Sequence, residues 1–378
     1  MKVSAFLDGL RYLDVDFFTG VPDSLLKPFC DTLYALYGDT GRHVVAANEG
    51  GAAALAAGHF IATGKVAVCY LQNSGIGNVV NPLASLLNEH VYGIPCVFVV
   101  GWRGEPGEVD EPQHVFQGMI SEDLLSLLGL PVFLLQQDTK DQAFFTMLDQ
   151  AKDALSGGKS VAFLLGKNSL TAGQAPAFEI RHFFHRKEAL HAILSTASPG
   201  EIFVSTTGKT SREVFALREE LGQDHHCDFL TVGSMGHAGM IALGIAKEKA
   251  DLTVWCLDGD GAGLMHLGNL AVEARQRAVN LIHVLLNNGA HESVGGMPVA
   301  RGALRFTPLA QAMGFEQCLC AESAQELHTQ LPRIRGQAGN GTRFLEIMLS
   351  AGSDPHLGRP TEAPKENLRA LMATLAGS

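Results

Sequence analysis

The sequence predicts an α/β protein built from two doubly wound parallel-sheet domains. The chain has 378 residues, which is more than one hydrophobic core usually serves and suits two domains of ordinary size. It is 46% hydrophobic and only 18% charged, a composition typical of a compact, heavily buried protein. Short apolar runs alternate with amphipathic stretches along the chain. Because strands that are apolar throughout are usually covered by helices on both faces, this alternation predicts parallel sheets.

The expected strands form two successive series. Those of the first series lie at 43–47, 65–71, 94–102, 130–135 and 160–166. Those of the second series lie at 201–205, 227–232, 252–257, 279–287 and 343–349. Between the series, residues 167–180 are polar and rich in turn-forming residues, which is typical of an interdomain linker. We therefore place the first domain at 1–168, the linker at 169–184 and the second domain, with a C-terminal tail, at 185–378.

Composition and charge exclude several classes of function. The formal net charge is -11 and the chain has no basic run, which argues against nucleic acids and acidic membranes as main partners. Seven cysteines are scattered without a CxxC pair of zinc-site spacing, so free thiols in a reducing cytoplasm are expected. Asp8, Arg11 and Asp14 interrupt the first segment before the apolar core of a signal peptide could form. No apolar run is long enough to cross a bilayer, so we expect a soluble cytoplasmic protein.

Two glycine motifs suggest nucleotide binding but lack a required residue. The tripeptide at 208–210 reads Gly-Lys-Thr, yet a phosphate-binding P-loop would need a glycine where Phe203 stands. The glycines at 75–77 follow an expected strand, but the third glycine of a dinucleotide fingerprint would fall at Val80. A P-loop nucleotidase and a nicotinamide-dependent dehydrogenase are therefore both disfavoured.

The segment from Gly259 to Asn288 carries a pattern typical of a metal site. Asp260 stands in a glycine-flanked turn at the end of one expected strand, and the next strand ends in Asn287-Asn288. Neighbouring parallel strands bring such residues to one edge of the sheet, where a hard cation can bind carboxylate and amide oxygens. The helix after Gly261 would direct N–H groups and a positive dipole end at phosphates. The alternative interpretation is an ordinary turn with an asparagine pair capping the next loop.

This segment resembles the diphosphate-binding motif of thiamine-diphosphate enzymes, in which GDG is separated from NN by a helix and a strand. The resemblance implies thiamine diphosphate and Mg²⁺ as cofactors, a pyrimidine-binding first domain and a diphosphate-binding second domain. It implies Asp260, the Asn288 side chain and a backbone carbonyl near Ala290 as metal ligands. The other residues of this turn that it assigns to the cofactor site are Gly259, Gly261 and Ala262.

The same resemblance implies a buried glutamate in the first domain, and Glu49 is the candidate. Glu49 lies at a strand end and begins an Ala-rich helix with small neighbours. In the family this residue binds N1′ of the cofactor's pyrimidine ring and favours the tautomer that deprotonates the thiazolium C2 atom. Burial is expected to raise its pKa. An acid that merely begins a helix is the alternative interpretation. The resemblance also places Gly75 in the cofactor site.

Further cofactor contacts are implied in the second domain. Gly233 matches the position whose carbonyl accepts from the cofactor's amino group, and Met235 matches the apolar wedge that bends the cofactor. Ordinary core packing is the alternative interpretation for Met235. Thr207 and Gly208 follow an expected strand, where the family closes over the diphosphate.

The substrate interpretation depends on resemblance in five segments, at 19–29, 70–86, 101–114, 205–213 and 287–296. These resemble the phosphonopyruvate decarboxylases, a group of thiamine-diphosphate-dependent 2-oxoacid decarboxylases. The resemblance implies decarboxylation of 3-phosphonopyruvate to phosphonoacetaldehyde and CO₂ in phosphonate biosynthesis. The candidate substrate-side residues are Asp23, Ser24, Asn73, Arg103, His114 and Lys209, with Arg212 and Arg301 as further cations. Each cation could instead be an ordinary solvated surface charge.

Two alternatives stay open. Sulfopyruvate decarboxylases act on a substrate of nearly the same shape, but they are often split into two subunits, which mildly favours the phosphonate for a fused chain. A non-catalytic homologue of the fold is the second alternative, and the joint presence of Glu49, Asp260 and Asn288 argues against it. In this family the cofactor bridges two subunits, so self-association into at least a dimer is implied.

Overall fold

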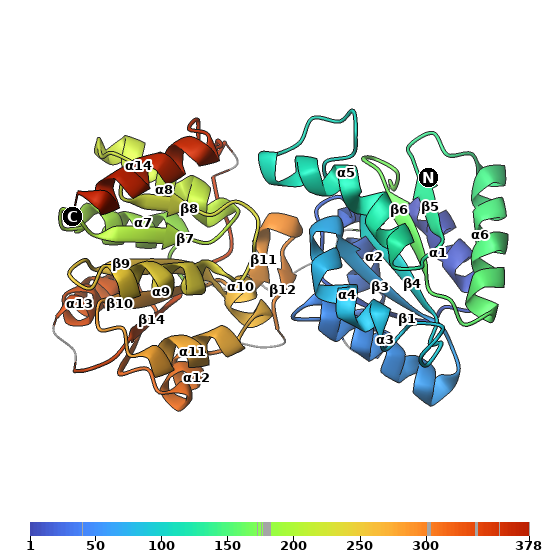
Figure 1. Ribbon diagram of the computed structural model, residues 1–378, viewed down its shortest axis with the longest axis horizontal. Helices are drawn as coiled ribbons and strands as arrows, with labels where there is room; N and C mark the ends of the chain where they lie inside the picture. The colour runs from blue at the N-terminus through green and yellow to red at the C-terminus, as the bar shows by residue number, and fades with distance from the viewer. Residues whose placement is uncertain are drawn as a thin grey trace. The chain divides into compact units, whose positions relative to one another are not determined.

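The computed structural model describes residues 1–378 except 40, 172, 175, 177–182, 301–303, 337–338, 355 and 378. The chain divides into two compact units, each with its own sheet (Figure 1). Unit 1 comprises Met1–Phe178 and Val294–Met297, and unit 2 comprises Glu179–Ser293 and Pro298–Ser378. Part of the predicted linker at 169–184, namely 172, 175 and 177–182, lies outside the described residues.

Unit 1 is a six-stranded parallel sheet in the order β2-β1-β3-β4-β6-β5. Its strands are β1 (Phe17–Gly20), β2 (His43–Val45), β3 (Ala67–Gln72), β4 (Cys96–Gly101), β5 (Val132–Leu135) and β6 (Val161–Leu165). Its helices are α1 (Val3–Tyr12), α2 (Lys27–Tyr37), α3 (Glu49–Thr63), α4 (Ile76–Ala84), α5 (Pro112–Leu127) and α6 (Asp141–Ser156), with the 3-10 helix η1 (Asn73–Gly75). Helices α1, α2 and α6 pack against one face of the sheet, and α3, α4 and α5 against the other.

Unit 2 is a second six-stranded parallel sheet, in the order β13-β14-β10-β9-β7-β8. Its strands are β7 (Ile202–Ser205), β8 (Asp228–Leu230), β9 (Val254–Gly259), β10 (Leu281–Asn287), β13 (Gln317–Ala321) and β14 (Arg343–Met348). The short segments β11 (Ala290–His291), η2 (Glu292–Val294) and β12 (Met297–Pro298) follow β10.

The helices of unit 2 also cover both faces of its sheet. They are α7 (Arg186–Ser195), α8 (Lys209–Leu221), α9 (Ala238–Glu248), α10 (Asp260–Met265), α11 (Gly268–Gln276), α12 (Thr307–Met313), α13 (Ala324–Arg335) and α14 (Pro364–Ala376). Helices α7, α8 and α13 pack against the sheet in one hydrophobic cluster. Helices α9 and α14 pack against it in a second cluster, and α11 and α12 in a third. The prediction of two doubly wound parallel sheets is confirmed.

Both sheets have the same strand order when their strands are numbered within each unit. In unit 1 the chain turns to opposite sides of β1, so the order reverses between β1 and β3. In unit 2 the reversal lies between β7 and β9. Open parallel sheets bind ligands beyond the carboxyl ends of the strands at such a reversal. The loops after β1, β3, β7 and β9 are therefore the expected binding loops.

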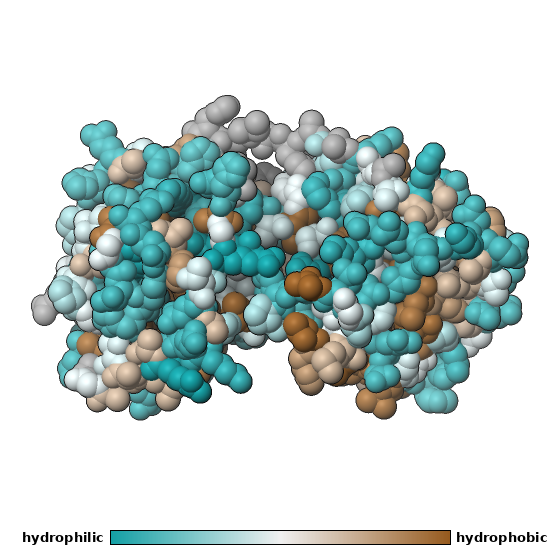
Figure 2. All heavy atoms as spheres, turned by 90° about the horizontal axis from the view of Figure 1, so that it is seen from above, coloured by the Kyte–Doolittle hydropathy of each residue, from teal (hydrophilic) through white to brown (hydrophobic). Residues whose placement is uncertain are grey.

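Most of the surface in view is hydrophilic, with apolar side chains in small groups (Figure 2). Helix α5 of unit 1 exposes several large apolar side chains. Phe116 is 66% exposed, Met119 62% and Leu127 84%. Val109, in the loop before α5, is 96% exposed. Among the described residues, no helix is both long enough and apolar enough to cross a membrane.

Candidate active site

Glu49 is buried at the start of α3 in unit 1. Asn48 caps this helix, because its side chain accepts a 2.8 Å hydrogen bond from the Gly51 N–H. The Asn78 amide of α4 donates to Glu49 Oε2 at 2.6 Å. Glu49 is only 5% exposed, and this burial raises the pKa of its carboxyl, although the Asn78 hydrogen bond offsets part of the effect. A carboxyl in this state can share a proton with a weakly basic ring nitrogen.

Gly75 makes room for that carboxyl. A Cβ atom added at Gly75 would lie 2.3 Å from Glu49 Oε1, so no larger residue fits without displacing the glutamate. Gly50, the second residue of α3, faces the Asn78 carbonyl, which would lie 2.9 Å from an added Cβ. The glycines therefore let α3 and the η1–α4 segment approach closely, and this approach positions Asn78 beside Glu49.

Arg103, after β4, is the centre of a second polar cluster in unit 1. Its Nε donates to Asp110 Oδ2 at 2.7 Å and its Nη1 donates to Ser24 Oγ at 2.9 Å. Asn73 fixes the backbone of Arg103, because its Nδ2 donates to the Arg103 carbonyl at 2.8 Å and its Oδ1 accepts from the Arg103 N–H at 3.2 Å. Burial would raise the pKa of Asp110, but the Arg103 guanidinium outweighs it and holds that pKa well below its usual range.

Asp23 lies in the same cluster and is fully buried. Its Oδ2 accepts backbone hydrogen bonds from Leu25 at 3.0 Å and Leu26 at 3.2 Å. Its Oδ1 has no hydrogen-bond partner among the described residues. Burial raises the pKa of Asp23 to about 6, against the opposing effects of these N–H groups and of Arg103. Gly101 permits this position, because an added Cβ there would lie 2.2 Å from Asp23 Oδ2.

His114, in the first turn of α5, completes the predicted substrate-side group. Its side chain is buried, and its Nδ1 has no partner within the part of the chain that the structure describes. Burial, together with the nearby positive charge of Arg103, lowers the pKa of His114. The structure thus brings Asp23, Ser24, Asn73, Arg103 and His114 together at the carboxyl end of the unit 1 sheet.

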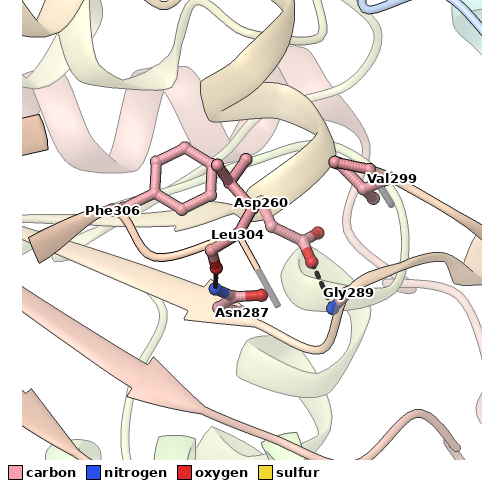
Figure 3. Close-up of a pocket in the computed structure, with 7 residues that line it drawn as sticks. Asp260, Asn287, Gly289, Val299, Leu304 and Phe306 are labelled. Atoms are coloured by element: carbon pink, nitrogen blue, oxygen red, sulfur yellow. Dashed lines mark hydrogen bonds between the residues drawn. The ribbon is translucent and has the colours of Figure 1, made fainter. Parts of the chain in front are cut away.

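The predicted metal ligands lie at the ends of two paired strands in unit 2. Asp260 follows β9 directly, and Asn288 follows β10, its hydrogen-bonded neighbour. The Asp260 carboxylate accepts from the N–H groups of Gly261, at 2.7 Å, and Gly289 (Figure 3). Asn288 Oδ1 accepts from the Ala290 N–H at 3.0 Å. A carboxylate, an amide oxygen and a backbone carbonyl form a donor set that suits Mg²⁺.

The two asparagines of the NN pair differ in their surroundings. Asn287 Nδ2 donates to the Leu304 carbonyl and to Glu346 Oε1, both at 2.8 Å, so its amide holds a structural position (Figure 3). Asn288 Nδ2 donates to Glu292 Oε2 at 2.9 Å. The residues around Asp260 line a small crevice with Val299, Ala300 and Phe306.

Gly261 provides space between two side chains above α10. A Cβ added at Gly261 would lie 3.2 Å from the His291 ring and 3.4 Å from Met235 Cε. His291 is buried, burial lowers its pKa to about 4, and its Nε2 has no partner among the described residues. A glycine cradle beside a carboxylate fits a diphosphate group with its metal. Gly259, the last residue of β9, and Ala262, buried in α10, complete this turn.

Thr207, Gly208 and Gly233 lie on two adjacent loops of unit 2. The Gly233 N–H donates to Thr207 Oγ1 at 3.0 Å. Gly208, with φ +92°, and Gly233, with φ +70°, adopt backbone conformations that favour glycine. Lys209 begins α8, and its Nζ donates to Glu292 Oε1 at 3.2 Å. Arg212 is on α8, and Arg301 lies outside the described residues.

Sequence reasoning did not single out several residues of these clusters, among them Asn78, Asp110, His291 and Glu292. Asn78 and Asp110 act through contacts between separate elements, for which the sequence gives no periodic pattern. Glu292 stands four residues after Asn288, and that spacing next to a predicted ligand is a signal that could have identified it.

Known proteins that resemble this chain match it over most of its length. The N-terminal TPP (thiamine pyrophosphate) binding domain of thiamine pyrophosphate enzymes matches residues 2–127, and the C-terminal TPP binding domain matches residues 206–347. A phosphonopyruvate decarboxylase from Streptomyces hygroscopicus is 36% identical over 98% of this chain and 92% of its own length. One from Streptomyces viridochromogenes is 34% identical over 97% and 92%. A sulfopyruvate decarboxylase from Methanosarcina acetivorans is 25% identical over 94% and 95%.

Proposed function

Since the chain belongs to the phosphonopyruvate decarboxylase family and is a thiamine-pyrophosphate-dependent 2-oxoacid decarboxylase, we propose that its substrate is 3-phosphonopyruvate. The products are phosphonoacetaldehyde and CO₂, and the reaction serves phosphonate biosynthesis. The observation that carries this choice is the identity of 36% to a phosphonopyruvate decarboxylase over nearly the full length of both proteins. The seven cysteines, all free thiols, support a cytoplasmic location.

We further propose that Mg²⁺ links the cofactor's diphosphate to unit 2. Asp260, the Asn288 side chain and the Ala290 carbonyl would hold the metal, and Thr207, Gly208, Gly261 and Ala262 would lie beside the diphosphate. Gly233 and Met235 would contact the cofactor's ring system. When bound, thiamine diphosphate supplies the electron sink that a 2-oxoacid needs to lose CO₂, because no side chain is an adequate sink.

In unit 1, Glu49 would hold the proton that activates the cofactor. Its buried carboxyl, with a raised pKa, would donate a hydrogen bond to N1′ of the pyrimidine while Asn78 keeps the second oxygen in place. Gly75 allows the carboxyl to occupy this position. The role of Glu49 is therefore to hold and share one proton with the cofactor, without itself contacting the reacting carbon.

The substrate side of the proposal rests on the Arg103 cluster. Arg103 donates hydrogen bonds to Asp110 and Ser24, and these contacts fix the orientation of its guanidinium. Asp23, whose pKa burial raises to about 6, and His114, whose pKa is lowered, lie in the same cluster. Lys209 is ion-paired with Glu292. Within unit 1, a phosphonate would thus meet the oriented guanidinium of Arg103.

Decarboxylation of sulfopyruvate is the second candidate function. The single-chain sulfopyruvate decarboxylase of Methanosarcina acetivorans matches this chain over 95% of its own length. Other sulfopyruvate decarboxylases that match are separate alpha and beta subunits, so fusion of the two halves favours the phosphonate only mildly. The remaining difference is chemical, because a phosphonate carries one more negative charge than a sulfonate.

A side-by-side assay tests the substrate. Phosphonopyruvate, sulfopyruvate and pyruvate are each supplied with thiamine diphosphate, with and without Mg²⁺, and released CO₂ and trapped aldehyde are measured. We expect the highest kcat/KM for phosphonopyruvate and little turnover without Mg²⁺. A preference for pyruvate or sulfopyruvate would overturn the substrate, and turnover that is insensitive to metal removal would overturn the Mg²⁺ proposal.

We also propose that the chain self-associates. The exposed apolar side chains of α5, including Phe116, Met119 and Leu127, support this, because contiguous exposed apolar residues commonly mark contact surfaces. Sedimentation velocity of the complete chain with thiamine diphosphate and Mg²⁺ should show a dimer or larger assembly. An active species that sediments as a monomer would contradict the proposal.

A further inference from the structure

Glu292 has an unusual number of donors around one carboxylate. Its side chain is only 11% exposed. Oε2 accepts from Arg186 Nη1 at 2.8 Å and from Asn288 Nδ2 at 2.9 Å. Oε1 accepts from Lys209 Nζ and from the Gly352 N–H, both at 3.2 Å. One carboxylate thus connects the start of α7, the start of α8 and the loops after β10 and β14, all within unit 2.

The hydrogen bond from Asn288 to Glu292 fixes which atom of the Asn288 amide, oxygen or nitrogen, is available to the proposed metal. An asparagine amide has one accepting oxygen and one donating NH₂ group, whereas an ionised carboxylate only accepts. Glu292 therefore selects the orientation in which NH₂ points toward it and Oδ1 points away. The Ala290 N–H, 3.0 Å from Oδ1, agrees with this orientation. A rotated amide would place NH₂ against an N–H donor and oxygen against the carboxylate.

Glu292 is itself held by a buried partner. Arg186 Nε and Nη2 bind the two oxygens of Glu213 at 2.7 and 3.0 Å, and Nη1 binds Glu292. Arg186 and Glu213 are both buried. Because all three guanidinium nitrogens have carboxylate partners, Arg186 has a fixed geometry. The position of the Glu292 side chain is therefore fixed by its contact with Arg186 of helix α7.

We propose that Glu292 is a positioning residue for the metal–diphosphate site, which orients the Asn288 amide oxygen for the metal and holds Lys209 at the start of α8. This inference rests on the proposed Mg²⁺ and thiamine diphosphate site. Partners that orient metal ligands in this way typically change metal affinity by about 10- to 100-fold when removed. The competing explanation is a purely structural ion-pair network.

Two matched variants separate these explanations. In the wild type, one oxygen of Glu292 accepts from Asn288 and the other from Lys209. Glu292→Gln replaces one of these two oxygens with an NH₂ group, which cannot accept. Glu213→Gln weakens the other ion pair of Arg186, because the Glu213 carboxylate accepts two hydrogen bonds from Arg186. The measurements are the Kd for Mg²⁺ at saturating thiamine diphosphate, by isothermal titration calorimetry, and the thermal midpoint of each protein without cofactor.

We expect Glu292→Gln to weaken Mg²⁺ binding about 10-fold or more, while Glu213→Gln lowers the thermal midpoint and weakens Mg²⁺ binding much less, because it leaves the contact between Glu292 and Asn288 in place. Equal losses of Mg²⁺ affinity in both variants would overturn the positioning role. If Glu292→Gln does not fold, Glu292→Asp keeps the charge opposite Arg186 but shortens the reach to Asn288, and it should weaken Mg²⁺ binding as well.

A double variant tests the amide orientation directly. In Asn288→Asp the side chain at 288 is a carboxylate, which offers an oxygen to the metal whichever way it is turned. The nearby Glu292 carboxylate then only repels it. Adding Glu292→Gln in the Asn288→Asp background should leave Mg²⁺ affinity unchanged or improve it, in contrast to its effect on the wild type. The same loss in both backgrounds would overturn the inference. Failure of the wild type to bind Mg²⁺ with thiamine diphosphate would instead overturn the proposed function.

Discussion

The buried carboxyl of Glu49 has three described neighbours that bear on its chemistry: Asn78, Gly75 and the cap residue Asn48. Glu49→Gln keeps the size and the hydrogen bond to Asn78 but removes the shared proton. We expect cofactor binding to persist and decarboxylation to fall by about 100- to 10,000-fold, the usual contribution of a positioned acid or base. Cofactor affinity by calorimetry and CO₂ release check this.

Glu326→Gln is a matched control, because Glu326 is an exposed acid in the first turn of α13. It should retain normal turnover. Near-normal turnover of Glu49→Gln would return Glu49 to the interpretation of an ordinary helix-start acid.

Asp23 predicts a pH dependence of stability. Its pKa is raised from 3.8 to about 6 in the folded protein, so the folded state binds this proton more tightly than the unfolded chain does. The stabilising contribution is therefore complete below about pH 4 and is lost as the pH rises through about 6. The difference between the two pKa values corresponds to at most about 3 kcal/mol.

Asp23→Asn removes this titration. The free energy of unfolding of the variant, relative to the wild type, should therefore rise between about pH 4 and pH 7, by up to about 3 kcal/mol. Urea unfolding at several pH values across this window measures it. A constant difference between the two proteins would show that Asp23 does not titrate as its burial predicts.

At the residue scale, the sequence predicted the groups that follow strand ends and missed those that depend on contacts between elements. Glu49, Asp260 and Asn288 stand at strand ends, where the α/β fold gathers ligand-binding residues. Asn78 and Asp110 were not predicted, because their importance arises only when α4 approaches α3 and when the loop before α5 folds back on Arg103. The roles assigned to all these residues remain predictions.

At the scale of single elements, the close approach of α3 and η1 gives a third prediction. Gly75→Ala would place a methyl group 2.3 Å from the original position of Glu49 Oε1, so the glutamate must move. A misplacement of about 1 Å at a catalytic group can cost about 100-fold in rate. We expect a loss of that order in kcat, with the fold retained, as judged by circular dichroism.

Gly77→Ala provides the control on the neighbouring helix α4. A Cβ at Gly77 meets open space, and alanine is favoured over glycine inside a helix by about 0.5–1 kcal/mol. This variant should have normal activity and equal or higher stability. If Gly75→Ala is as active as Gly77→Ala, Glu49 does not need its observed position for catalysis.

The elements differed in how well their sequences predicted them. The ten expected strands, from 43–47 to 343–349, all overlap observed strands, because most are apolar runs in a sheet covered on both faces. Of the strands in the two six-stranded sheets, β1 and β13 were not predicted. β1 has only four residues and runs directly into a proline-containing loop, and β13 is an edge strand whose residues are mostly half-buried. Neither segment has the apolar pattern, separated by turn residues from its neighbours, on which most of the other predictions rested.

At the scale of the whole molecule, the proposed cofactors should stabilise the folded chain. A ligand that binds only the folded state at about 100 times its Kd adds about 2.7 kcal/mol. Thiamine diphosphate with Mg²⁺ should therefore raise the thermal midpoint, and a chelator should reverse the rise. Thiamine monophosphate, which lacks one phosphate group, should stabilise less. An unchanged midpoint with both cofactors, or the same rise without metal, would contradict the proposed diphosphate site.

The common strand order of the two sheets has a consequence for how such an enzyme changes during evolution. Each unit encloses its own core and offers an equivalent set of loops at the reversal of its strand order. The loops of unit 1 carry Asp23, Asn73 and Arg103, and those of unit 2 carry the GDG and NN residues. On the proposed roles, selection for a new oxoacid would act mainly on the loops that carry Asp23 and Arg103, while the loops proposed to hold the diphosphate and its metal stay unaltered. Enzymes of this family with different substrates should diverge first after β1 and β4.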